Sequence, residues 1–180
     1  MSESLAKYLD TFAGWLRTLG EDAEKLGGLL EGKGGSQPAR EAIAGGLNYL
    51  FKSLDLIPDG IDDIGYLDDA FVLRVAADLA INDEAATEQM KVLSPLANDS
   101  EVLRAFLDKD YVRLEAYVKG LRTGAARGRS VGDILGDDAV RADFLSDVRG
   151  FAKTYESPGF SREEKNLIKL KAFFDAKLPK

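Results

Sequence analysis

Hydrophobic residues recur at intervals of three and four along most of the chain, the spacing that places them on one face of an α-helix. The first such stripe runs from Leu5 to Leu30. Ser2 or Ser4 is expected to cap this helix, because a serine side chain accepts a hydrogen bond from a free backbone N–H group there. Residues 32–38 then combine glycine, serine and proline, which predicts a flexible break before the next helix.

Two strongly apolar helices are predicted next. The first covers residues 38–54 and contains Gly45 and Gly46, a pair that indicates close approach of another part of the chain. The second covers residues 66–81 and has almost no polar face, so we expect it to be the buried central helix. Together they form a central apolar hairpin.

The remaining apolar stripes predict more helices, at residues 84–93, 100–107, 111–121, 138–155 and 162–176. No segment alternates apolar and polar residues over enough positions to predict a strand. The predicted fold class is therefore all-α, a single-domain bundle of seven or eight helices around the central apolar hairpin.

We divide this one domain into three parts. Residues 1–35 form an N-terminal helical arm, and residues 36–98 form the hairpin with the turn that joins its helices. Residues 99–180 form C-terminal helices that pack on the same core. The Gly- and Arg-rich segment of residues 123–136 is expected to be a loop within that core.

Composition excludes several kinds of site. The chain has 180 residues with no cysteine and no histidine, so it lacks thiolate nucleophiles, imidazole bases, disulfides and zinc sites with nitrogen or sulfur ligands. The formal net charge of -7 disfavours nucleic acid as a partner. Neither a secretory signal nor a membrane span is predicted, and we expect a cytoplasmic protein.

The acidity is concentrated between the two apolar helices, where residues 55–69 hold six aspartates and no lysine or arginine. These carboxylates repel one another unless a cation, free amides or basic residues lie close by. One interpretation is a divalent cation, Mg²⁺ or Ca²⁺, with Asp55, Asp59, Asp68 and Asp69 as ligands. The other is structural: Asp68 and Asp69 fall in the first turn of a helix, where negative charge is favourable.

Basic residues give two further candidates. Arg74 lies inside the second apolar helix, where a buried guanidinium requires a carboxylate, and Asp78 four residues later is the expected partner. Arg122, Arg127 and Arg129 lie together without an acid among them. They could contact an anion or a partner's carboxylate, and a solvated loop is the simpler interpretation.

The acidic segment also resembles a known family. The residues that carry the resemblance are Tyr49-Leu50, Asp55-Leu56-Ile57-Pro58-Asp59 and Gly65-Tyr66-Leu67-Asp68-Asp69. They resemble the signature of the YkvA family, a small helical domain catalogued as domain of unknown function 1232, over roughly residues 39–81. The resemblance implies a helical hairpin joined by an acidic turn, without a settled activity. Members occur as stand-alone bacterial proteins and within a membrane-bound ubiquitin ligase, which implies an interaction module.

Three functions remain open from the sequence. The first is a non-enzymatic binding module that presents the acidic turn, Asp62 and Asp63 in particular, to a basic protein surface. The second is divalent-cation binding at the aspartates, either structural or in metal-dependent hydrolysis. The third is peripheral attachment to a membrane through Phe12 and Trp15 beside Lys7, which the overall acidity of the chain disfavours.

Overall fold

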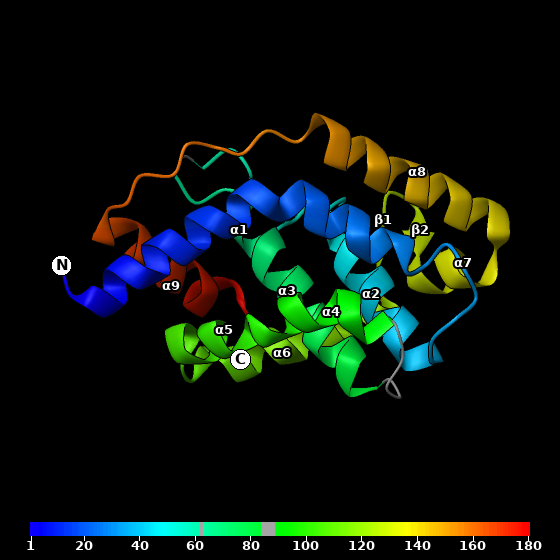
Figure 1. Cartoon of the computed structure of the whole chain (residues 1–180), viewed down its shortest axis with the longest axis horizontal. Coiled ribbons are helices and arrows are strands. Elements are labelled where there is room, and N and C mark those ends of the chain that lie inside the picture. The colour runs from blue at the N-terminus through cyan, green and yellow to red at the C-terminus, as the bar shows by residue number, and fades with distance from the viewer. Residues whose placement is uncertain (62, 84–88) are drawn as a thin grey trace.

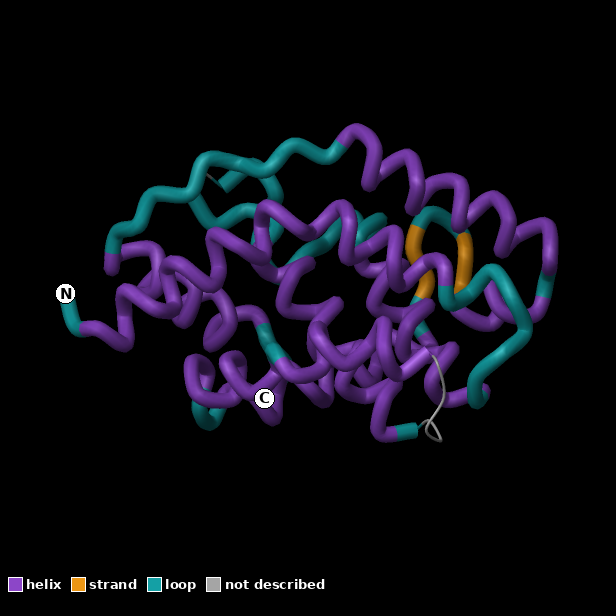
Figure 2. Tube along the Cα trace, in the orientation of Figure 1, coloured by secondary structure: helices purple, strands orange, loops and turns teal. Residues whose placement is uncertain are grey.

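A computed structural model of the chain describes residues 1–61, 63–83 and 89–180. These residues fold into helices with a very small antiparallel sheet (Figure 2). The helices are α1 (Glu3–Gly28), α2 (Gln37–Tyr49), α3 (Leu67–Asn82), α4 (Gln89–Asn98), α5 (Ser100–Leu107), α6 (Asp110–Gly120), α7 (Val131–Gly136), α8 (Asp138–Thr154) and α9 (Glu164–Lys177). The predicted all-α bundle is confirmed. The helix expected at 84–93 lies partly outside the described residues.

Helices α2 and α3 form the central hairpin, as expected (Figure 1). All side chains from Leu67 to Ala77 of α3 are buried. The two helices meet closely at Gly46, where an added Cβ atom would lie 2.6 Å from the Cβ of Ala76. An added Cβ at Gly45 would lie 3.1 Å from the carbonyl oxygen of Leu121. The glycine pair therefore marks a close approach on both sides of α2, as the sequence predicts.

The long helix α1 packs on α2, α3 and α8, and its apolar face belongs to the common core. Phe12 is fully buried, and its ring centroid lies 5.0 Å from that of Phe71 on α3. Phe174 of α9 stacks on the same Phe71 ring at 5.2 Å. Because Phe12 and Trp15 are buried in this core, the face on which membrane attachment depended is covered by protein. None of the described helices is long and apolar enough to cross a bilayer.

Two boundaries differ from the sequence prediction. Helix α2 ends at Tyr49 rather than at residue 54, and the chain then continues as turns up to α3. The segment of residues 123–136 is not only a loop: it contains the strands β1 (Ala125–Ala126) and β2 (Arg129–Ser130), followed by α7. Ser130 and Asp133 start α7 with a reciprocal capping box, in which each side chain accepts a hydrogen bond from the backbone N–H of the other residue.

Candidate functional site

Asp55, Asp59 and Asp63 lie on the compact turn between α2 and α3, residues 50–61 and 63–66, which we call the acidic turn. It is wound by hydrogen bonds from the N–H of Ile61 to the carbonyl of Pro58 over 3.0 Å, and from the N–H of Gly65 to the carbonyl of Ile61 over 2.9 Å. An added Cβ atom at Gly65 would lie 2.4 Å from the carbonyl oxygen of Asp59, so only glycine fits this crossing. The turn thereby returns Asp59 to the start of α3.

Three carboxylates meet where the acidic turn contacts α3. Asp59, Asp68 and Asp69 each have a carboxylate oxygen within 4.8 Å of the others, and we call these three residues the acid cluster. Asp68 and Asp69 are 0% and 3% exposed, whereas Asp59 is exposed to solvent. Asp55, the fourth ligand expected from the sequence, lies outside this group of three and is half-buried. The cluster is therefore a buried pair of acids with one carboxylate at its rim.

The hydrogen bonds of the acid cluster are incomplete. Oδ2 of Asp68 accepts hydrogen bonds from the hydroxyl of Tyr49 over 2.5 Å and from the N–H of Ile57 over 3.3 Å. Oδ1 of Asp68 and Oδ2 of Asp69 are buried and have no hydrogen-bond partner among the described residues. Oδ1 of Asp55 is likewise buried without a hydrogen-bond partner among the described residues. Buried acceptors of this kind normally accept a hydrogen bond, so these oxygens could still accept one or bind a cation.

Burial and mutual repulsion oppose ionisation of these acids. Burial raises the pKa of Asp68 to about 6, and burial together with the charges of Asp68 and Asp59 raises the pKa of Asp55 to about 7. The pKa of Asp69 is raised well above its ordinary value by burial and by the charges of Asp68 and Asp59. The positive charge of Lys52 acts in the opposite direction on Asp55, and the hydrogen bonds from Tyr49 and Ile57 do so on Asp68, by lowering these pKa values.

Basic side chains do not neutralise the acid cluster. In the part of the chain that the structure describes, no lysine or arginine forms an ion pair with Asp55 or with a member of the cluster. Of the compensating groups that the sequence analysis considered, an amide is present on Asp68, which also accepts a hydrogen bond from the hydroxyl of Tyr49. Asp63 is half-buried with a φ of 75°, and Asp62 lies outside the described residues.

The expected pairing of Arg74 with Asp78 is wrong. Arg74 is buried and donates to Asp22 of α1 over 3.2 Å and to Asp99 over 3.0 Å. It also donates to the carbonyl of Ala70 over 3.1 Å, so its guanidinium points toward the N-terminal end of α3. Side chains on a helix incline toward its N-terminus, so the guanidinium of Arg74 points away from Asp78, which lies one turn later. Asp78 pairs with Arg104 instead, over 3.0 Å.

The three arginines that follow α6 have separate environments. Arg122 forms an ion pair with Asp83 over 3.1 Å, and Arg129 forms one with Asp147 over 2.8 Å. Arg127 is exposed and lies over the ring of Phe51, 4.9 Å from its centroid. None of the described acids forms an ion pair with Arg127. The expected group of three is thus one free guanidinium and two that are already paired.

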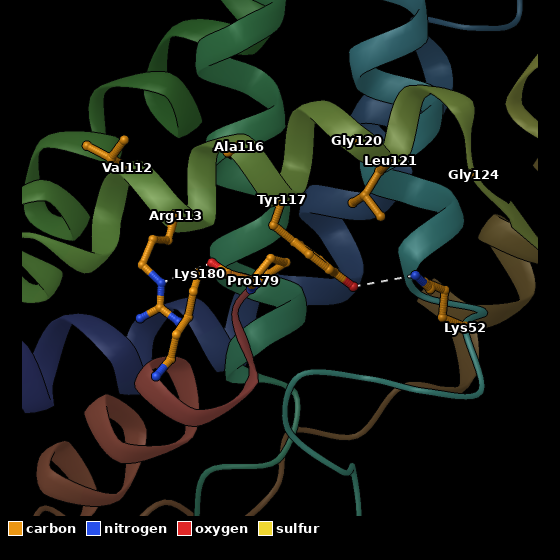
Figure 3. Close-up of a pocket in the computed structure, with 10 residues that line it drawn as sticks. All are labelled: Lys52, Val112, Arg113, Ala116, Tyr117, Gly120, Leu121, Gly124, Pro179 and Lys180. Carbon is orange, nitrogen blue, oxygen red and sulfur yellow. Dashed lines mark hydrogen bonds between the residues drawn. The ribbon is translucent and has the colours of Figure 1, made fainter.

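Several hollows adjoin the acidic turn, and two of them are of similar volume. One, of about 490 Å³, lies beside α6 and the C-terminal residues, where the ammonium of Lys52 lies 3.4 Å from the hydroxyl of Tyr117 (Figure 3). The other, of about 500 Å³, is lined by residues of the acidic turn and of α8, and Asp59 and Arg127 both line it. We call the second one the polar hollow. Asp59 is the member of the acid cluster that lines it.

Comparison with known proteins agrees with the resemblance seen in the sequence. The model of a family described as "Protein of unknown function (DUF1232)" matches residues 39–74. The matched segment contains most of α2, the acidic turn, the acid cluster and the first half of α3. Comparisons with curated proteins and with solved structures found no match.

Proposed function

We propose that the acid cluster binds a divalent cation, Mg²⁺ or Ca²⁺, with Asp59, Asp68 and Asp69 as carboxylate ligands. The observation that carries the proposal is that Asp59, Asp68 and Asp69 each have a carboxylate oxygen within 4.8 Å of the others, while Oδ1 of Asp68 and Oδ2 of Asp69 are buried without a hydrogen-bond partner among the described residues. A buried carboxylate without a partner is strongly unfavourable. A hard cation with oxygen ligands removes that penalty for all three acids at once.

Burial favours a cation over a protein as the direct partner of the two inner acids. Asp68 and Asp69 are almost inaccessible, so a basic side chain of another protein could not contact them without displacing the acidic turn. A cation would approach them from the side of Asp59, which is exposed to solvent and lines the polar hollow. Once bound, it would join the acidic turn to the first turn of α3. We therefore propose a cation that fixes the shape of the turn.

Thermal unfolding with and without a divalent cation tests this function. A ligand that binds only the folded state raises its stability by about 2.7 kcal/mol at a concentration of 100 times Kd, which corresponds to roughly 5 to 10 °C in Tm for a chain of this size. We expect Mg²⁺ or Ca²⁺ to raise Tm at about pH 8, and a chelator to reverse the increase. A Tm that is the same with cation and with chelator contradicts the proposal.

Two asparagine variants locate the site. Asp69→Asn should remove the effect of the cation on Tm, because it takes a negative charge from the centre of the cluster. Asp108→Asn is the matched control, because it makes the same change of charge at an exposed residue outside the acidic turn. The control should respond to the cation as the unmodified protein does. If Asp69→Asn also keeps the full response, the cation binds elsewhere.

A basic protein surface is a second candidate partner, supported by the acids that the turn leaves accessible. Asp59 is exposed and Asp63 is half-buried, so both could contact a partner while the inner acids hold a cation. Binding of a lysine-rich peptide, measured by fluorescence anisotropy, should then weaken in Asp63→Asn and remain unchanged in Asp108→Asn. Equal binding by the two variants would reject a role for Asp63.

A further inference from the structure

The polar hollow has opposite charges on its walls. Asp59 contributes a carboxylate of the acid cluster, and Arg127 contributes a guanidinium without an ion-pair partner among the described residues. Ser146 of α8 adds a hydroxyl group. The volume of about 500 Å³ lies within the range typical of small-molecule sites. The hollow is therefore large enough for a ligand and has polar groups of both signs to orient one.

Arg127 differs from its two neighbours in being available. Arg122 and Arg129 are held by Asp83 and Asp147, whereas Arg127 rests on the face of Phe51. Its backbone has a φ of 51°, which is unusual for a residue other than glycine and belongs to the tight turn between β1 and β2. The hairpin thus places one free guanidinium on the hollow that also reaches the acid cluster.

We propose that the polar hollow binds a phosphate group, whose oxygens contact both the cation in the acid cluster and the guanidinium of Arg127. The inference rests on the proposed cation site. Without a cation, Asp59 and Asp147 would repel an anion from this hollow. Mg²⁺ requires an octahedral set of ligands and commonly combines one or two carboxylates with phosphate oxygens. The planar fork of arginine donors matches the remaining phosphate oxygens.

The hollow of Figure 3 is a competing anion site. Lys52, Arg113 and Lys180 line it together with apolar side chains, and no acid does. Arg113 is already bonded to Asp110 and to the carbonyl oxygen of Leu178, which leaves it little capacity for a ligand. Phosphate bound in this hollow would need Lys52 and would not depend on a cation or on Arg127. The two sites can therefore be distinguished by experiment.

Titration with inorganic phosphate in the presence of Mg²⁺, followed by isothermal calorimetry and by Tm, tests the inference. We expect phosphate to bind and to raise Tm beyond the effect of Mg²⁺, and to have no such effect with chelator at the same ionic strength. Arg127→Gln should weaken phosphate binding at least about tenfold, as expected for loss of a charge-assisted contact, and should keep the full response to Mg²⁺. Arg149→Gln, an exposed arginine of α8 that does not line the hollow, is the control and should bind phosphate normally.

Each outcome separates the two proposals. If Mg²⁺ raises Tm but phosphate does not bind, the phosphate site is overturned and the cation site stands. If Mg²⁺ has no effect, both are overturned. Phosphate binding that is as strong in Arg127→Gln overturns the role of Arg127. Phosphate binding that persists with chelator and is lost in Lys52→Gln assigns the anion to the hollow of Figure 3 and overturns the inference.

Discussion

The hydroxyl of Tyr49 donates a hydrogen bond to Oδ2 of Asp68 over 2.5 Å and accepts one from the N–H of Leu56 over 2.7 Å. This one group joins the last residue of α2, the acidic turn and the first turn of α3. Burial and the negative charges of Asp68 and Asp69 raise the pKa of Tyr49, so the hydroxyl keeps its proton and acts as the donor. It therefore supplies the acid cluster with a hydrogen-bond donor, which a basic residue would otherwise supply.

Tyr49→Phe should lower the free energy of unfolding by about 1 to 3 kcal/mol, because it leaves the buried N–H of Leu56 without a partner and removes a hydrogen-bond donor from Oδ2 of Asp68. It should also raise the pKa of Asp68, since the hydrogen bond from Tyr49 lowers that pKa. Urea unfolding near neutral pH measures the first effect. Tyr8→Phe is the control, because Tyr8 makes ring contacts and its hydroxyl is not part of the site. An equal decrease in the free energy of unfolding in Tyr49→Phe and Tyr8→Phe would contradict the role given to Tyr49.

Without a divalent cation, stability should fall as the pH rises from about 4 to above 7. The folded-state pKa values of Asp68 and Asp55 are about 6 and about 7, above the ordinary value of 3.8. At a pH below their ordinary pKa, these acids are protonated in both the folded and the unfolded state, so they cause no loss of stability. At higher pH the unfolded chain ionises first, which favours unfolding until the pH exceeds the folded-state pKa values. The chain has no histidine to add an opposite trend in this window.

The free energy of unfolding, measured in chelator at several pH values from about 5 to 8, checks this trend. Asp69→Asn should flatten the profile and raise stability at the upper end by about 1 to 3 kcal/mol, because it removes a buried charge without a partner. Asp108→Asn should leave the slope unchanged. A stability that rises through this range in the unmodified protein would show that the acids are neutralised by groups other than protons.

A divalent cation should reverse the trend. Protons and Mg²⁺ compete for the same oxygens, so the increase in Tm caused by Mg²⁺ should be small near pH 5 and should grow as the pH passes the raised pKa values of Asp68 and Asp55. Thermal unfolding at fixed Mg²⁺ over this range measures the effect. An increase in Tm that is the same at all pH values would place the cation on acids of ordinary pKa, outside the cluster.

The sequence predicts the hairpin well because its evidence is local and repeated. Helical spacing gives α2 and α3, and the absence of a polar face gives the burial of α3. The pair Gly45 and Gly46 predicts close packing, which the contacts with Leu121 and Ala76 confirm. These features depend on residues near one another in the chain or on one dominant property, the burial of apolar surface.

The details of the site depend on contacts between distant residues, which the sequence does not reveal. After Tyr49 the N–H groups of Leu50, Phe51 and Lys52 bond three residues back in a tightened turn, and those of Leu56 and Ile57 bond to the side chains of Tyr49 and Asp68. The partners of Arg74 come from α1 and from the start of α5, so no spacing along α3 could identify them. Likewise, the sequence predicts crowded aspartates but cannot tell which of them the folded turn directs inward.

Gly46→Ala should destabilise the protein, because its added methyl group would lie 2.6 Å from the Cβ of Ala76. Overpacking of this kind costs about 1 to 3 kcal/mol, of which about 1 kcal/mol is offset by the higher helix propensity of alanine. Gly46→Ala combined with Ala76→Gly should recover the packing loss, with a coupling energy of about 0.5 to 3 kcal/mol in a double-mutant cycle. Gly150→Ala in α8, where an added Cβ contacts nothing within 4 Å, should stabilise the protein slightly. Additive effects of the first two substitutions would contradict the contact.

Arg74 and Arg104 form a matched pair for the last prediction, because each binds carboxylates and they differ in burial. The side chain of Arg74 is 2% exposed, donates to Asp22 and Asp99, and lies 4.2 Å from the centroid of the Trp15 ring. The side chain of Arg104 is 42% exposed. Arg74→Gln should therefore cost about 3 to 5 kcal/mol, since it leaves a carboxylate in the interior without its cation.

Arg104→Gln should cost about 1 kcal/mol or less, because the guanidinium of Arg104 is 42% exposed and its ion pairs are screened by water. Arg74→Lys should fall between the two, since an ammonium keeps the charge but cannot reproduce the planar fork that reaches both acids and the carbonyl of Ala70. Urea unfolding of the three variants measures the order. If Arg74→Gln costs no more than Arg104→Gln, Asp22 and Asp99 are stable in the interior without a cation. The acid cluster, which holds the same kind of buried carboxylate, would then not need a cation either.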